Sequence, residues 1–304
     1  MKFANDYSNP KLQLEAVWTL ARITFGTTQQ SRTVIDSGAI TPLIQILQIS
    51  KSPDLIEQSL RCLANIAGDS SQFRDELLFS GVAELLLEII SGNHNLSMLI
   101  IAVRCIANLC SGKPPPKLDS VISSIPVLCS LLTSNDVTIV KEACRGLKYF
   151  SSSSNEKIEI IIQQGAIPLL IPLLSHSSDD VVSNALRVIG NIVTGRDIQT
   201  EAFLKANGLP AVAKLLNTSN HMIRKEATWT VSNIAAGNKS QIQIVIDENI
   251  VPKLLLMILN ESSDISLEAV WVISNIAYGG TNWIFDIKRS FKYLQRDSSK
   301  DENR

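Results

Sequence analysis

The segment KEATWTVSNIAAG, residues 225–237, decides the fold, because its second half recurs along the chain. The seven copies are ARITFGT from Ala21, ANIAGDS from Ala64, ANLCSG from Ala107, KYFSSS from Lys148, GNIVTG from Gly190, SNIAAG from Ser232 and SNIAYGG from Ser274. Their second residues stand at positions 22, 65, 108, 149, 191, 233 and 275, in steps of 43, 43, 41, 42, 42 and 42 residues. A nearly constant step of this length indicates an array of structural repeats.

A second marker keeps the same period and divides each repeat into helices. It reads Gly38-Ala39-Ile40, Gly81-Val82-Ala83, Ser124-Ile125-Pro126, Gly165-Ala166-Ile167, Gly208-Leu209-Pro210 and Asn249-Ile250-Val251. Gly or Asn suits a left-handed backbone at the end of a short helix, and the next helix starts directly after it. That second helix has apolar residues at helical spacing, and a longer third helix leads into the first marker. Three helices per repeat are typical of armadillo units, whereas HEAT and tetratricopeptide units have two.

One such unit cannot bury its apolar faces alone, so stacked units must share a continuous core. We therefore predict an all-α fold, a right-handed superhelical armadillo solenoid of about seven three-helix repeats of about 42 residues. The third helices are expected to line its concave surface. The solenoid is predicted over residues 1–282, with incomplete terminal repeats. Residues 283–304 leave the pattern, and we predict a divergent charged tail there, for which a capping helix or a disordered segment both remain open.

Composition agrees with packed helices and limits the partners. Apolar residues make up 45% of the chain and aromatic residues 5%, so the core must be mainly aliphatic. The 29 acidic residues nearly balance the 28 basic ones, and we expect neither nucleic acid nor a membrane as partner. The apolar run 166–174 is far shorter than the roughly 20 residues that span a bilayer. The five cysteines have no metal-ligand spacing, which favours a reducing, intracellular setting.

Residues that carry common catalytic chemistry are scattered. His94, His176 and His221 fall in polar turns, each without a Cys or a second His at ligand spacing. Cys105 and Cys110 are five residues apart on one predicted helix, which favours packing over a redox pair. The chain has no phosphate-binding loop of the G-x-x-x-x-G-K-[ST] type. We predict no catalytic site, no metal and no cofactor.

The third helices carry a stripe of residues three and four positions apart, which places them on one helix face. The stripe reads Glu226-Trp229-Asn233, then Glu268-Trp271-Asn275, and in the first repeat Glu15-Trp18-Arg22. Asn can bond a peptide N–H and C=O together, an indole face can hold a cation or a lysine stem, and a carboxylate can pair with an ammonium group. The stripe therefore favours an extended basic ligand. The alternative is that Trp and Asn are packing residues of the repeat.

The stripe and its surroundings resemble importin alpha. The resemblance rests on EQSLRCLANIAGDSSQFRD from Glu57, ALRVIGNIVTGRDIQT from Ala185, KEATWTVSNIAAG from Lys225 and EAVWVISNIAYGGT from Glu268, and it covers roughly residues 11 to 281. It implies a receptor in the cytoplasm and nucleus that binds nuclear localisation signals as extended basic peptides. The family holds them at a major site on early repeats and a minor site on later ones.

Carried over residue by residue, the resemblance implies two sites. The minor-type site consists of Tyr149, Arg187, Asn191, Thr194, Glu226, Trp229, Asn233, Glu268, Trp271 and Asn275. The major-type site consists of Trp18, Gly26, Ser31, Gln58, Asn65, Asp69 and Asn108. Gly26, Ser31 and Asp69 stand where the family holds the key lysine of the signal.

Four arginines depart from the family pattern in the early repeats. Arg22 replaces an asparagine of the ladder, and Arg61, Arg104 and Arg145 stand where the family usually has tryptophan. Like charges about 4 Å apart repel by about 1 kcal/mol in water, so the major-type site should be weakened and basic peptides should prefer the minor-type site. Arg61 could instead pair with Glu57 one turn earlier as a surface ion pair. The main alternative function is a scaffold that binds acidic or phosphorylated peptides through these arginines.

The resemblance also concerns the ends of the chain. The family has an arginine-rich amino-terminal segment that binds importin beta, and final repeats that bind its export factor. Neither pattern occurs in these 304 residues. We therefore expect importin beta to bind only if such a segment is supplied.

Overall fold

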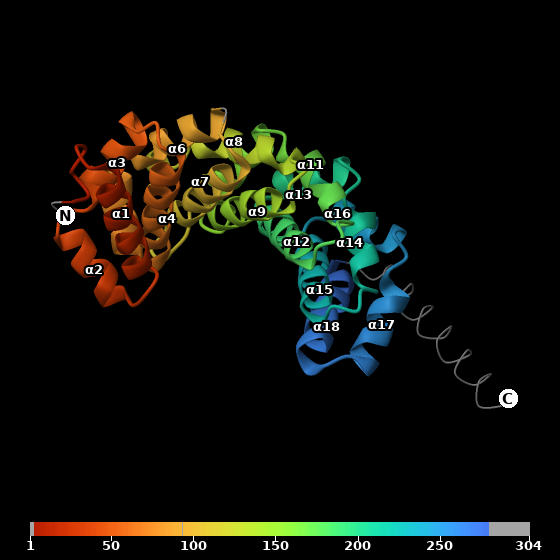
Figure 1. Cartoon of the computed structure of the whole chain (residues 1–304). Coiled ribbons are helices and arrows are strands. Elements are labelled where there is room, and N and C mark those ends of the chain that lie inside the picture. Colours follow the sequence, from red (N-terminus) through yellow and green to blue (C-terminus); the bar gives the residue numbers. More distant parts are fainter. Residues whose placement is uncertain (1–2, 93, 280–304) are drawn as a thin grey trace. The chain divides into compact units, whose positions relative to one another are not determined.

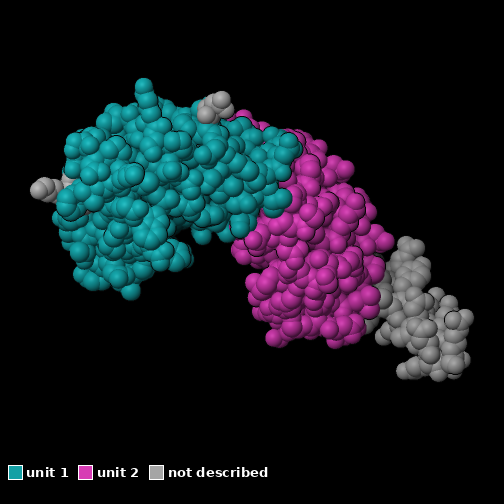
Figure 2. Space-filling model, in the orientation of Figure 1, with its two compact units in different colours: residues 1–153 teal, residues 154–304 magenta. Residues whose placement is uncertain are grey.

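A computed structural model describes residues 3–92 and 94–279 (Figure 1), and the tail predicted for residues 283–304 lies outside them. The described residues form helices and no strands. They fall into two compact units, residues 1–153 and 154–304 (Figure 2). An all-helical armadillo solenoid was predicted, and this prediction is confirmed.

Unit 1 contains four third helices, which pack side by side in chain order. Its elements are α1 (Pro10–Thr24), α2 (Thr28–Asp36), α3 (Ile40–Ile49), α4 (Pro53–Asp69), α5 (Ser71–Phe79), α6 (Val82–Ser91), α7 (Leu96–Leu109), the 3₁₀ turn η1 (Leu118–Ser120), α8 (Ser124–Ser130), the 3₁₀ turn η2 (Leu131–Thr133) and α9 (Val137–Ser151). The third helices of this unit are α1, α4, α7 and α9.

Unit 2 contains three complete helix triplets. Its elements are α10 (Asn155–Gln163), α11 (Ala166–Leu173), α12 (Asp179–Val193), α13 (Asp197–Lys205), α14 (Leu209–Leu215), α15 (His221–Ala235), α16 (Lys239–Asp247), α17 (Val251–Asn260) and α18 (Ser263–Gly279). The third helices α12, α15 and α18 pack in that order.

Side-chain caps start most of the third helices. Asn9, Ser52, Asn95, Asp136 and Asn220 each accept a hydrogen bond from a backbone N–H two or three residues later. Such a cap satisfies one of the donors that a helix start leaves open. The polar turns between second and third helices therefore set where the third helices begin.

The second marker marks the left-handed backbone at most, but not all, positions. Gly38, Gly81 and Gly165 have φ between 70° and 79°, and Asn249 has φ of 57°. In the fifth copy the left-handed residue is Asn207, one position before the predicted Gly208, because Asn tolerates this conformation nearly as glycine does. Gly208 has φ of −81° and lies where any Cβ would strike the ring of Phe203.

One repeat lacks its first α-helix. Three consecutive prolines, residues 114–116, remove backbone donors there, and only the turn η1 forms before α8. The buried Arg74 ties this loop down, since its Nη1 donates to the carbonyl oxygens of Ser111 and Pro114. The three-helix pattern is therefore preserved in outline, with a loop replacing one short helix.

The core is aliphatic, as composition predicted. Each third helix buries one face of Leu, Ile, Val and Ala side chains, among them Leu60, Leu63, Ile106, Leu147, Val188, Ile189, Val231 and Val272. No helix within the described ranges is long and apolar enough to cross a membrane. Five free cysteines are buried in unit 1.

Candidate functional site

The predicted asparagine ladder of unit 2 is formed by side chains that bridge successive third helices. Asn233 on α15 donates from Nδ2 to Thr194 Oγ1 at the end of α12, over 3.0 Å. Asn275 on α18 donates from Nδ2 to the carbonyl oxygen of Ser232 on α15, over 3.1 Å. An amide carries an acceptor oxygen besides its two donor hydrogens. These bonds fix both amides while leaving acceptor capacity for a peptide N–H.

The indole of Trp229 lies on a glycine of the preceding third helix. A Cβ built on Gly190 would stand 2.3 Å from Trp229 Cζ3, so only glycine leaves room for the ring. The Arg187 guanidinium lies over the same ring, 4.9 Å from its centroid, and pairs with Glu226. Arg187 therefore contacts both Glu226 and Trp229 of the predicted site.

The next rung of the stripe is more open. Trp271 is 56% exposed, which leaves an indole face accessible on α18. Glu268 lies one turn before it, and burial raises the pKa of its carboxyl while the charge of Lys225 opposes that shift. Lys225 itself pairs with Asp264 over 3.0 Å. An indole, an amide and a carboxylate thus share one face of α18.

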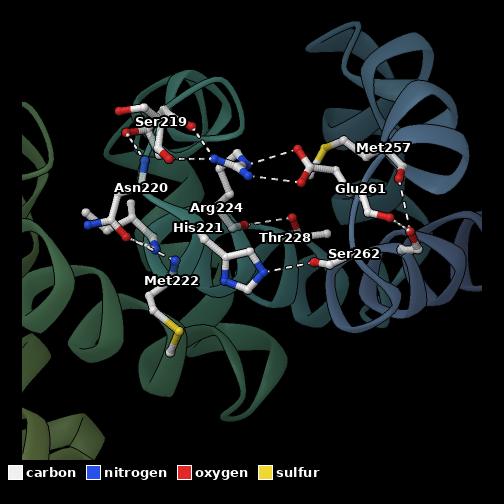
Figure 3. A network of polar contacts seen from close by, with 12 residues as sticks. Ser219, Asn220, His221, Met222, Arg224, Thr228, Met257, Glu261 and Ser262 are labelled. Carbon is white, nitrogen blue, oxygen red and sulfur yellow. Dashed lines mark hydrogen bonds and ion pairs between the residues drawn. The ribbon is translucent and has the colours of Figure 1, made fainter.

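A polar network fixes the start of α15 against the start of α18 (Figure 3). Arg224 donates to the carbonyl oxygens of Thr218 and Ser219 and forms an ion pair with Glu261, with the closest contacts between 2.8 and 3.0 Å. His221 Nε2 lies 2.9 Å from Ser262 Oγ. This network holds the two third helices in the register that aligns the stripe.

The same cluster has no catalytic geometry. Ser262 Oγ donates directly to Asp264 Oδ1 over 2.6 Å, whereas in a Ser-His-Asp triad the imidazole stands between hydroxyl and carboxylate. Within residues 3–92 and 94–279, no group of three or more His, Cys, Asp or Glu side chains could hold a metal ion.

The asparagine ladder of unit 1 bridges successive third helices as in unit 2, but one of its amides is also bonded by an arginine side chain. Asn65 Nδ2 donates to the carbonyl oxygen of Ala21 over 3.0 Å, and Asn108 Nδ2 donates to that of Ala64 over 2.9 Å. Asn108 Oδ1 also accepts a bond from Arg145 Nη1 over 2.8 Å. Both ends of the Asn108 amide are therefore engaged within the protein.

The four unusual arginines of unit 1 have different partners. Arg61 pairs with Glu57 over 2.7 Å, which confirms the surface-pair alternative for this residue. Arg104 and Arg145 share the buried carboxylate of Glu142, at 3.2 and 2.6 Å. Arg22 lies over the indole of Trp18, 4.9 Å from the ring centroid.

Three residues of the major-type site surround the first turn of α2. Asp69 Oδ1 accepts a 2.6 Å bond from Thr28 Oγ1. Gly26 is exposed, and the Gln30 amide oxygen occupies the place of a Cβ. Ser31 is fully buried and donates to the carbonyl oxygen of Thr24, so the expectation that it contacts a ligand was wrong. The resemblance gave its register but not the inward direction of its side chain.

A model of the armadillo/beta-catenin-like repeat matches residues 27–68, 114–152, 154–194, 196–236 and 238–278, which is more than half of the chain. The chain belongs to the armadillo repeat family. Individual armadillo relatives include importin subunit alpha-3 of Arabidopsis thaliana, 44% identical over 165 residues, and importin subunit alpha-B of Dictyostelium discoideum, 41% identical over 164 residues. The matches cover 54% and 53% of this chain and only 31% and 32% of those proteins, so the chain matches about a third of their length.

Solved armadillo structures share the fold. An engineered protein, a target of the Northeast Structural Genomics Consortium, superposes with a TM-score of 0.88 at 28% identity, over 95% of this chain and 70% of its own. A designed armadillo repeat protein in complex with the peptide (KR)4 superposes with a TM-score of 0.53 at 24% identity, over 90% of this chain and 97% of its own. The second likeness supports the fold alone.

Within the armadillo repeats, nine of the ten residues of the minor-type site lie in unit 2, on α12, α15 and α18 or directly after α12. The tenth, Tyr149, lies on α9 in unit 1, where Lys148 Nζ stands 5.0 Å from its ring centroid. Sequence reasoning missed Gly190 and Glu142, whose roles depend on neighbours in adjacent repeats. The sequence does single out Gly190, because it is the smallest residue to begin any of the seven recurring segments, such as GNIVTG and SNIAAG.

Proposed function

We propose that unit 2 binds extended basic peptides of the nuclear-localisation-signal type along α12, α15 and α18. The observation that carries this proposal is the repeated indole-amide stripe, in which Asn233 and Asn275 are fixed by bonds to the preceding third helix. Preorganised amides lose little side-chain entropy on binding a peptide backbone. Indole faces and a carboxylate beside them select a lysine or arginine side chain.

The two rungs play different parts in this proposal. The methylene stem of a basic side chain packs against the exposed indole of Trp271, and its charged group pairs with the carboxylate of Glu268. At Trp229 the incoming cation meets Arg187, which already covers the ring and pairs with Glu226. Binding at that rung therefore includes exchange of one cation for another, and Trp271 is the stronger anchor for an isolated lysine.

The comparisons support the proposal at the level of relatives. Importin alpha subunits of plants and Dictyostelium are 41 to 44% identical over about half of this chain. A designed protein of the same fold has been solved with an alternating lysine and arginine peptide. We propose that the partners are proteins with basic nuclear localisation signals, and that the chain acts in the cytoplasm and nucleus.

The test is a titration of a lysine-rich peptide into the whole chain and into Trp271→Ala. Loss of an indole that contacts a cation should cost about 0.5–2 kcal/mol of binding free energy. The control is Phe79→Ala, which truncates an aromatic side chain that is 96% exposed in unit 1. The proposal fails if Trp271→Ala binds as tightly as the unaltered chain, or if both variants lose affinity equally.

A further inference from the structure

A cavity of about 510 Å³ opens between the third helices of unit 1. It is lined by residues of α1, α4 and α7 and by the residue after α1, among them Trp18, Arg22, Phe25, Arg61, Asn65 and Arg104. Three of these side chains carry a positive charge and none a negative one. The cavity lies at the register where unit 2 presents indoles and carboxylates.

The carboxylates around this cavity do not balance its arginines. Arg61 bonds Glu57 through Nε and Nη2, which leaves the Nη1 donors for a ligand, and the single carboxylate of Glu142 is shared between Arg104 and Arg145. The guanidinium of Arg22 lies over the indole of Trp18. Among the described side chains, no carboxylate lies within ion-pair distance of Arg22. The guanidinium groups of these four arginines thus have only two carboxylates as ion-pair partners, so net positive charge remains around the cavity. The side chains of Arg61 and Arg104 are about half exposed. Guanidinium groups bind carboxylates in a planar, two-pronged geometry.

The remaining lining favours a peptide over another polyanion. Trp18 is 45% and Phe25 82% exposed, so the cavity offers aromatic surface beside its charges. The amide of Asn65 donates to the carbonyl oxygen of Ala21 and keeps acceptor capacity for a peptide N–H. Nucleic-acid backbones offer phosphates and sugar hydroxyls but no row of N–H donors. The combination suits an extended chain with acidic residues around an apolar one.

We propose that this cavity binds an acidic segment of a polypeptide, with carboxylates on Arg22, Arg61 and Arg104 and an apolar side chain against Trp18 and Phe25. The site is separate from the proposed basic-peptide site of unit 2 and of opposite charge preference. It also explains why arginines occupy the indole positions of α4 and α7. They supply the charge that this second ligand needs.

The experiment measures fluorescence anisotropy of a labelled glutamate-rich peptide with a central phenylalanine, mixed with the full chain. Arg22→Gln with Arg61→Gln should weaken binding roughly tenfold or more, because two charge-assisted contacts are lost. The charge-matched control is Lys11→Gln with Lys51→Gln, which removes two exposed charges of the same unit away from the cavity. Arg22→Lys with Arg61→Lys should fall between, since lysine keeps the charge and loses the planar fork. Affinity of the unaltered chain should decrease with added salt.

Three results would overturn the inference. The first is that the acidic peptide does not bind the unaltered chain. The second is that Arg22→Gln with Arg61→Gln and the control Lys11→Gln with Lys51→Gln lose affinity for the acidic peptide equally. The third is that a single-stranded oligonucleotide binds in place of the peptide. A lysine-rich peptide titrated into the same arginine variant separates the two sites. Its affinity should stay within about twofold, because unit 2 is unchanged. Failure of that peptide with success of the acidic one would count against the proposed function alone.

Discussion

Gly190→Ala should lower the free energy of unfolding when Trp229 is present and raise it when Trp229 is replaced by alanine. Alanine is about 1 kcal/mol better than glycine in a helix interior, and Gly190 lies inside α12. The added Cβ would stand 2.3 Å from Trp229 Cζ3, however, and such overpacking typically costs about 1–3 kcal/mol. Gly190→Ala alone should therefore lower the free energy of unfolding by about 0–2 kcal/mol.

In the Trp229→Ala background the nearest remaining neighbour of the added Cβ is Thr230 Oγ1, at 3.2 Å, and a small shift accommodates it. The helix-propensity gain should then appear as a stabilisation of up to about 1 kcal/mol. Urea titration followed by circular dichroism on the four chains of this double-mutant cycle gives the coupling energy directly. If Gly190→Ala has the same effect in both backgrounds, the indole does not lie on Gly190 and the geometry of the first rung is wrong.

Three further outcomes follow from single groups. Arg145→Leu leaves the carboxylate of Glu142, which is 5% exposed, with Arg104 as its ion-pair partner. Urea titration should therefore show a free energy of unfolding that is lower by about 1–3 kcal/mol. An unchanged urea midpoint would contradict the shared ion pair. Because the pKa of Glu268 is raised, its carboxyl takes up a proton earlier than an ordinary glutamate as pH falls, and calorimetry should show weaker binding of a lysine-rich peptide at pH 5 than at pH 7. Burial raises the pKa of the Cys62 and Cys105 thiols from 9.0 to about 12. Between about pH 9 and 12 the unfolded chain therefore loses these thiol protons while the folded chain keeps them, and the free energy of unfolding decreases as pH rises through this range. A thiol reagent that labels both cysteines in the folded chain at neutral pH would refute their burial.

Periodicity was enough to predict the fold, because each third helix repeats the same register. A residue such as Asn233 or Asn275 is placed on its helix face by counting, and its neighbour one repeat earlier follows from the period. The missing first helix before α8 was visible only as three prolines, whose effect depends on what else can satisfy the backbone there. In this case the buried Arg74 does so from the preceding repeat.

Side-chain partners across repeats could not be read from the sequence. Arg145 was expected to stand in a tryptophan position, but counting gave no sign that it would bond Asn108 Oδ1 and share Glu142. Ser31 shows the opposite failure, since a register match placed it at the surface and packing turned it inward. Helical periodicity fixes the face of a residue on its own helix. Which atom it meets depends on distances between helices that the sequence does not contain.

The central claim is that the later repeats carry peptide binding, and one calorimetric comparison at fixed salt tests it. Salt must be constant because charges are screened within about 10 Å at 0.1 M. Trp229→Ala with Asn233→Ala should weaken binding of a lysine-rich peptide by roughly 1–3.5 kcal/mol, since the indole contact and the paired amide are lost together. Asp69→Lys, which removes only the bond from Thr28 in unit 1, should leave affinity within about twofold. Loss of binding in Asp69→Lys with full binding in the Trp229 and Asn233 variant would place the function in the early repeats and contradict the account.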